Sequence, residues 1–219
     1  MIFNLIDIDH WDRKTYFEHF LYHSRCTFSM TANIDITVLL KRLRKQGIKL
    51  YPTFIYMVAS IVNSNKEFRT SLDEYGRLGY WDEMTPSFTI FHDDNKTFSS
   101  IWSEYSSNFM TFYKNYKEDI MLYGDVKEMN PKKNEPRNTF PISCIPWTSF
   151  TGFNLNIFSD GTYLLPIITG GKYFEQGDKI LFPISLQVHH AVCDGYHASK
   201  FFNELQQLVD SCDRWLYII

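Results

Sequence analysis

The pattern of apolar and polar residues predicts helices in the first third of the chain. Apolar positions recur three and four residues apart over residues 11–23 and again over residues 53–65. This spacing is typical of a helix with one buried face. Between these segments, Asp35 is placed to cap a further helix that runs through Leu43, and Gly47 is placed to end it.

Short apolar runs, broken by Gly, Pro and Asp, predict strands over most of the remaining chain. Residues 68–72 and 77–81 flank a turn-like break and predict a hairpin. Two segments differ, since residues 103–123 predict a long aromatic-rich helix and residues 124–139 a surface loop. The other expected strands are residues 26–32, 87–91, 96–101, 140–145, 153–158, 163–169 and 179–189.

The order of these elements predicts the fold class. Helices dominate the first third, strands dominate the rest, and an amphipathic helix over residues 196–211 comes last. This order argues against repeated βαβ units. It favours a two-layer α/β sandwich, in which helices pack on one side of a mixed, mostly antiparallel sheet. Because no stretch divides the chain convincingly, we expect residues 1–219 to form a single domain.

Composition narrows the class of protein. Of the 219 residues, 44% are hydrophobic and 17% aromatic, which suits a packed core or an aromatic-lined pocket. The net charge of −3 comes without a basic stripe, so no nucleic-acid partner is expected. No apolar run approaches the length of a membrane span, and no signal-like run begins the chain. We therefore expect a cytoplasmic protein with reduced cysteines and no membrane partner.

The most distinctive stretch joins the last expected strand to the last expected helix. It holds two histidines and an aspartate at a strand-to-helix corner, which is a rigid place from which to present reactive side chains. Its sequence is Gln187-Val188-His189-His190-Ala191-Val192-Cys193-Asp194-Gly195.

Strand alternation separates the two histidines, because neighbouring residues of a strand point to opposite faces. His189 follows Gln187, whereas His190 follows Val188 on the apolar face. A partly desolvated imidazole favours its neutral form. A general base needs that form at neutral pH. His190 is therefore the predicted base.

Other interpretations of the corner stay open. Asp194 either orients the imidazole as in a catalytic triad or caps the helix and pairs with an arginine, and the loop between the two residues favours the second role. Cys193 is either a nucleophile or, as we favour, a small buried residue. His190, Asp194 and His197 together offer metal ligands, but their spacing matches no standard zinc motif, so no metal is expected.

The corner resembles the signature of the chloramphenicol acetyltransferase family, and the resemblance covers essentially the whole chain. It implies the CoA-dependent acyltransferase fold and a homotrimer with active sites at subunit interfaces. The further segments that occur in family order are Trp11-Asp12-Arg13-Lys14, Cys26-Thr27-Phe28-Ser29, Lys49-Leu50-Tyr51-Pro52, Phe88-Thr89-Ile90-Phe91-His92, Thr97-Phe98-Ser99, Ile142-Ser143-Cys144-Ile145-Pro146-Trp147, Phe153-Asn154-Leu155-Asn156 and Pro166-Ile167-Ile168-Thr169.

The resemblance also implies a reaction. Acetyl passes from acetyl-CoA to the 3-hydroxyl of chloramphenicol, which inactivates the antibiotic, with no covalent acyl-enzyme and no permanently bound cofactor. His190 is then the base, Ser143 stabilises the oxyanion, and Thr169 assists through a bound water. Asp194 pairs with Arg13 as structural support.

The same resemblance implies binding residues, in an aromatic pocket between subunits. The matching substrate-binding positions are Phe20, Cys26, Phe28, Thr89, Phe98 and Leu155. The matching coenzyme A positions are Lys49, Trp147, Phe153, Lys172 and Tyr173. His19 and Ser24 depart from some relatives and change the expected pocket shape.

Three alternative functions also remain open at this point. The first is an acetyl-CoA-dependent O-acetyltransferase that uses the same machinery on another hydroxylated small molecule. A protein that binds the drug without catalysis and a metal hydrolase are the other two. The presence of both His190 and Ser143 argues against the non-catalytic binder.

Overall fold

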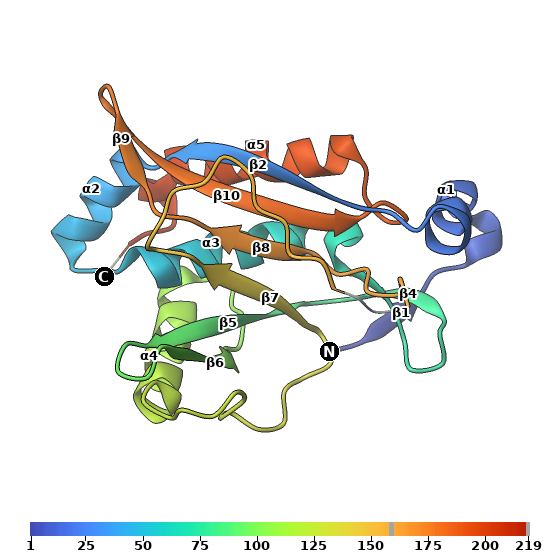
Figure 1. The fold of residues 1–219 in the computed structure, drawn as a ribbon, viewed down its shortest axis with the longest axis horizontal. Coiled ribbons are helices and arrows are strands. Elements are labelled where there is room, and N and C mark those ends of the chain that lie inside the picture. Colours follow the sequence, from blue (N-terminus) through green and yellow to red (C-terminus); the bar gives the residue numbers. More distant parts are fainter. Residues whose placement is uncertain (158–159, 218–219) are drawn as a thin grey trace.

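A seven-stranded sheet forms the centre of the computed structural model, which describes residues 1–157 and 160–217 (Figure 1). Its strands are β2 (Thr27–Asp35), β5 (Thr85–His92), β6 (Thr97–Trp102), β7 (Thr139–Cys144), β8 (Ile167–Gly170), β9 (Phe174–Gln176) and β10 (Lys179–His189). They lie in the order β2-β10-β8-β7-β5-β6, and β9 pairs with β10. The pairs β5–β7 and β7–β8 are parallel and the others antiparallel, which confirms the predicted mixed, mostly antiparallel sheet.

A smaller sheet contains the predicted hairpin. Its strands are β1 (Phe3–Leu5), β3 (Thr70–Leu72) and β4 (Leu78–Trp81), in the order β1-β4-β3. The antiparallel pairing of β3 with β4 confirms the hairpin. Neither β1 nor β9 was expected, because three residues are too few to display an alternating pattern.

Helices cover one face of the large sheet (Figure 1). They are α2 (Thr37–Gln46), α3 (Leu50–Ser64), α4 (Phe109–Tyr123) and α5 (Gly195–Asp210), whereas α1 (Lys14–Glu18) lies beyond the end of β10 (Figure 1). The ring of Phe54 on α3 packs edge-on against Phe182 of β10, with centroids 5.2 Å apart. This burial of apolar side chains between one sheet face and the helices confirms the predicted two-layer sandwich. None of these helices is long and apolar enough to cross a membrane.

Helix ends differ from the predictions where capping overrides the apolar pattern. The helix predicted over residues 103–123 begins only at Phe109, because the Asn108 side chain accepts a hydrogen bond from the Thr111 amide at 3.0 Å. The helix predicted over residues 11–23 begins at Lys14, and it continues after Glu18 as a π-helical turn over His19–His23.

The next two helices follow their predictions more closely. Gly47 ends α2 in the left-handed conformation, with φ of 66°, as expected. Asp35 accepts from the Thr37 amide at 3.1 Å, although Ile36 is the N-cap residue. The third helix, α3, begins at Leu50, three residues earlier than predicted.

A long loop between β7 and β8 crosses the other face of the sheet (Figure 1). Ser185 of β10 donates to the Phe153 carbonyl at 2.6 Å, and Gln187 accepts from the Leu155 amide at 3.0 Å. These side chains bind backbone groups that a strand partner would otherwise take. The strand predicted over residues 153–158 was therefore wrong for 153–157, and residue 158 lies outside the described residues.

The strand predicted over residues 163–169 is also shorter than expected, since β8 begins at Ile167, directly after Pro166. A proline has no amide hydrogen for the ladder. The last residue of β8 is tightly packed, because a Cβ on Gly170 would lie 2.6 Å from the Phe182 ring. A Cβ on Gly171 would lie 2.7 Å from the Phe150 ring. Both glycines are needed so that these rings can approach the backbone.

Candidate active site

The strand-to-helix corner is held by a dense set of backbone hydrogen bonds. Strand β10 ends at His189, and α5 begins at Gly195. The His190 amide donates to the Cys26 carbonyl at 2.8 Å, which ties the corner to the chain that enters β2. The amides of Val192 and Cys193 both donate to the His189 carbonyl at 3.1 Å. The corner therefore presents its side chains from a fixed backbone.

The two nitrogens of the His190 imidazole have different roles, because one is hydrogen-bonded to the backbone and the other carries the lone pair. Its Nδ1 lies 3.1 Å from the Cys193 carbonyl oxygen, which can only accept a hydrogen bond. Nδ1 must therefore carry the proton, which leaves the lone pair of the neutral ring on Nε2. The ring stacks on Phe20 with centroids 3.9 Å apart and planes 4° apart, and Phe28 lies edge-on at 5.3 Å. Phe28 pairs with Val188, so His190 lies on the side that strand parity predicts.

His189, the neighbouring histidine, is buried and bound to the backbone of the corner. His189 is 3% exposed, and its Nδ1 accepts from the Ala191 amide at 3.1 Å. Burial lowers the pKa of His189, and the adjacent His190 lowers it further. His189 also lines a cavity of about 280 Å³ together with Cys26 and Tyr163. It supports the corner and does not compete for the role of base.

A pair of hydroxyls lies on two neighbouring strands at the centre of the sheet. Ser143 of β7 pairs in register with Thr169 of β8, and their hydroxyl oxygens are 2.9 Å apart. Thr169 pairs in turn with Ser185, whose side chain points to the crossing loop. Because residues paired directly across a sheet share a face, Ser143 and Thr169 lie on the loop face, opposite the helices. Such a hydroxyl pair can donate to a developing negative charge.

One chain does not bring the histidine and the serine together. His190 comes five residues after Ser185, the partner of Thr169. At about 3.3 Å per residue this is a separation of roughly 16 Å along the strand. The two groups also lie on opposite faces, because His190 contacts Phe28 on the helix side. A site that uses both must therefore take them from two different chains.

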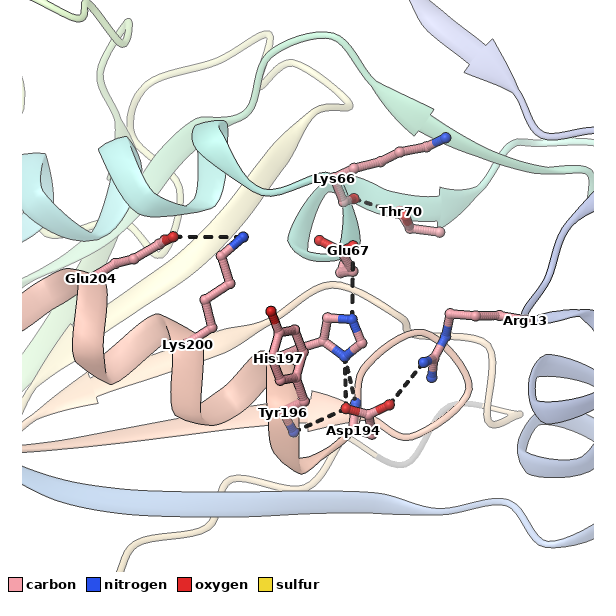
Figure 2. A network of polar contacts seen from close by, with 9 residues as sticks. All are labelled: Arg13, Lys66, Glu67, Thr70, Asp194, Tyr196, His197, Lys200 and Glu204. Atoms are coloured by element: carbon pink, nitrogen blue, oxygen red, sulfur yellow. Dashed lines mark hydrogen bonds and ion pairs between the residues drawn. The ribbon is translucent and has the colours of Figure 1, made fainter.

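Asp194 forms polar contacts with Arg13, Tyr196 and His197 at the start of α5 (Figure 2). Arg13 donates to its carboxylate at 2.9 Å, and the Tyr196 amide donates to it at 3.0 Å. Asp194 is thus the N-cap of α5. Partial burial alone would raise the pKa of Asp194, but the hydrogen bond from Arg13 and the positive charge of that residue outweigh it and hold the pKa below the usual value of an aspartate. The geometry fits the structural role and not the triad.

We expect Asp194→Asn to lower the free energy of unfolding at neutral pH by about 1–2 kcal/mol, after allowing for the partial exposure of the pair. Asparagine keeps the cap but loses the charge that Arg13 binds. Because the folded-state pKa of Asp194 is depressed, this contribution is present above about pH 4 and is lost as the pH falls through the folded-state value. Urea denaturation at several pH values checks this. A difference from wild type that stays constant down to about pH 3 contradicts it.

Two alternatives for the corner find no support in the geometry. Cys193 is 1% exposed, and burial raises the pKa of its thiol, so it is not an activated nucleophile. Within residues 1–157 and 160–217, no three His, Cys, Asp or Glu side chains gather in a group that could hold a metal ion.

Comparison with known proteins identifies the family. A family model described as chloramphenicol acetyltransferase matches residues 1–206. The chain belongs to the chloramphenicol acetyltransferase family. It is similar to the chloramphenicol acetyltransferase of Clostridium butyricum, with 61% identity over 99% of each chain. The protein of that name from Staphylococcus aureus is 48% identical over 99% of this chain and 100% of its own. The chain is therefore an enzyme of an acyltransferase family, as the resemblance implied.

Solved structures support the same fold. One named chloramphenicol acetyltransferase matches with a TM-score of 0.85 and 22% identity, over 95% of this chain and 100% of its own. The dihydrolipoamide acetyltransferase of Azotobacter vinelandii matches with a TM-score of 0.66 and 18% identity, over 87% of this chain and 84% of its own. The predicted CoA-dependent acyltransferase fold is confirmed.

The six substrate-binding positions predicted from the chloramphenicol acetyltransferase family fall into two groups. Phe20, Cys26 and Phe28 surround His190, through the ring contacts and the backbone bond described above. The other three belong with the hydroxyl pair on the loop face. Phe88 pairs with Ile142 of β7, so Thr89 and Ser143 are the next residues along these two strands. Phe98 pairs with Phe91, which comes two residues after Thr89. The Leu155 amide donates to the Gln187 side chain.

The coenzyme A positions predicted from the family also fall into two groups, one at a cavity and one on the loop face. Lys172 and Tyr173 line an apolar cavity of about 200 Å³ between the end of β8 and the start of α3. Lys49 is the N-cap of α3, next to this cavity. Cys144 lines it too, and burial raises the pKa of that thiol to about 11.

Two of the predicted coenzyme A positions do not line this cavity. Trp147 is 58% exposed and lies edge-on to Phe91, with centroids 4.5 Å apart. Phe153 packs against Phe150 in the crossing loop, with centroids 5.6 Å apart. Both therefore lie on the loop face of the sheet.

Two residues that matter to the geometry were missed by the sequence interpretation. Gln187 is 6% exposed and joins Ser29 of β2 to the crossing loop. A buried glutamine in an apolar strand is the signal that could have marked it. His197 entered only as a possible metal ligand. Its position three residues after the N-cap aspartate is the spacing of a capping box.

Proposed function

We propose that this enzyme transfers acetyl from acetyl-CoA to the 3-hydroxyl of chloramphenicol and so inactivates the antibiotic. The observation that carries the proposal is the similarity, over nearly the whole chain, to proteins named chloramphenicol acetyltransferase, at 61% and 48% identity. The chain would act as one catalytic domain in the cytoplasm, with acetyl-CoA as a co-substrate and no resident cofactor.

The chemistry follows from the two groups described above. Nε2 of His190 removes the proton of the 3-hydroxyl, and the oxygen forms a bond to the thioester carbonyl carbon. The Ser143 hydroxyl donates to the resulting oxyanion, with Thr169 assisting through its contact with Ser143 and a bound water. Collapse of the intermediate breaks the carbon–sulfur bond. The coenzyme A thiolate then takes the proton back from His190, and no acyl-enzyme forms.

This mechanism needs two subunits. The separation of His190 from Ser143 within one chain supports a site that combines the histidine group of one subunit with the serine group of the next. A heterologous contact of this kind closes into a ring, and a trimer is the ring that the family resemblance implies. The apolar cavity beside Lys172 and Tyr173 would take part of acetyl-CoA, with Lys49 near its phosphates.

The direct test measures thiol release from acetyl-CoA by the purified enzyme. Release that depends on chloramphenicol, together with a product acetylated at the 3-hydroxyl, supports the proposal. If another hydroxylated compound supports release and chloramphenicol does not, the acceptor assignment is wrong. Binding of chloramphenicol without any release of thiol would instead indicate a protein that only sequesters the drug.

A further inference from the structure

A single peptide group connects two histidines at the corner. The carbonyl of Cys193 and the amide of Asp194 belong to the same planar peptide unit. The carbonyl oxygen accepts from Nδ1 of His190 at 3.1 Å. On the other side, the amide donates to Nδ1 of His197 at 3.2 Å. Any rotation of this peptide changes both hydrogen bonds together.

We propose that His197 is a positioning residue for His190, which it orients through the Cys193–Asp194 peptide. The inference rests on the proposed role of His190 as the base. A peptide whose amide is engaged has a more polarised carbonyl, which is a better acceptor. Held in this way, the carbonyl keeps the His190 proton on Nδ1 and the lone pair on Nε2.

The surroundings of His197 fix its own orientation (Figure 2). Its side chain is 13% exposed, and its Nε2 faces a carboxylate oxygen of Glu67 at 3.8 Å. A proton on Nε2 points toward that negative charge, which leaves Nδ1 as the acceptor. The Tyr196 ring lies edge-on to the imidazole, with centroids 5.5 Å apart.

A competing arrangement involves the Asp194 carboxylate. Its Oδ1 lies 2.9 Å from Nδ1 of His197. A proton on Nδ1 would bind that oxygen and release the Asp194 amide, so the two arrangements differ in whether the peptide is held. Oδ1 already accepts from the Tyr196 amide at 3.0 Å, and Nδ1 of His197 is the acceptor of the Asp194 amide among the residues that the structure describes. The geometry is that of a capping box, with the third helical residue accepting from the N-cap amide.

Two variants of His197 separate this role from general support of the helix. His197→Phe keeps a ring of similar shape but has no acceptor. His197→Asn places an amide oxygen where Nδ1 stands and restores the bond to the Asp194 amide. We expect His197→Phe to lower kcat about tenfold, the rate equivalent of one lost hydrogen bond, with little change in the KM for acetyl-CoA. His197→Asn is expected to recover most of that loss.

Nitrogen NMR of histidine-labelled enzyme provides a readout that does not depend on activity. In the wild type we expect His197 to carry its proton on Nε2 and His190 to carry its proton on Nδ1. In His197→Phe the Nδ1 signal of His190 shifts, and in His197→Asn it returns toward the wild-type position. A proton on Nδ1 of wild-type His197, or equal losses of kcat in the two variants, would overturn the inference. If His190→Ala keeps full turnover, the proposed role of His190 as the base fails instead, whatever the NMR result.

Discussion

Replacing His190 by alanine is expected to lower kcat for acetyl transfer roughly a thousandfold, because a positioned general base contributes about that much. The imidazole stacks on Phe20, and its Nδ1 is bound to the Cys193 carbonyl, so no other group in the corner presents a free basic nitrogen in the same place. His189 cannot replace it, since its Nδ1 is occupied by the Ala191 amide.

Steady-state rates of thiol release, with chloramphenicol and acetyl-CoA both saturating, measure this effect. His10→Ala is the matched control, because His10 is an exposed histidine that pairs with Asp7. That control should retain the wild-type rate. If His190→Ala is folded and turns over as fast as the control, His190 is not the base.

Replacing Ser143 by alanine is expected to lower kcat about a hundredfold or more, the usual effect of removing one oxyanion donor. The Thr169 hydroxyl stays in place but loses its partner at 2.9 Å. Substrate binding should change little, since the charge that Ser143 is proposed to stabilise develops only in the transition state.

The measurement is kcat and KM for both substrates, with Ser64→Ala as the control for loss of an exposed hydroxyl. The Ser64 side chain donates to the carbonyl of Ser60 within its own helix. A rise in KM without a fall in kcat would assign Ser143 to ground-state binding and contradict the oxyanion role.

The strongest patterns in the sequence predicted the elements that frame the site. Strand β10 has the predicted bounds, and α5 lies within one residue of its prediction at each end. Uninterrupted apolar residues and an aspartate cap leave little ambiguity there. The prediction failed over residues 153–157, where an alternating pattern belongs to a loop whose backbone binds Ser185 and Gln187. The conformation of this loop depends on hydrogen bonds to side chains that are distant in the sequence, and the local periodicity of residues 153–157 cannot reveal those bonds.

The site could be predicted only in part, and for a related reason. Strand parity and the motif indicated His190, and the resemblance indicated Ser143 and the contact between Arg13 and Asp194. The sequence separation of His190 and Ser143 does not reveal that they lie on opposite faces of one sheet. That fact depends on the register of β7, β8 and β10, which is set by long-range pairing.

The central claim is that each active site takes its histidine from one subunit and its serine from another. Subunits of His190→Ala and Ser143→Ala, carrying different affinity tags, can be refolded together and the mixed assemblies isolated through both tags. In a mixed assembly of the proposed trimer, only one interface joins an intact histidine to an intact serine, so we expect about one third of the wild-type activity, although each parent variant is nearly inactive. Mixed assemblies no more active than the parents would contradict the shared site.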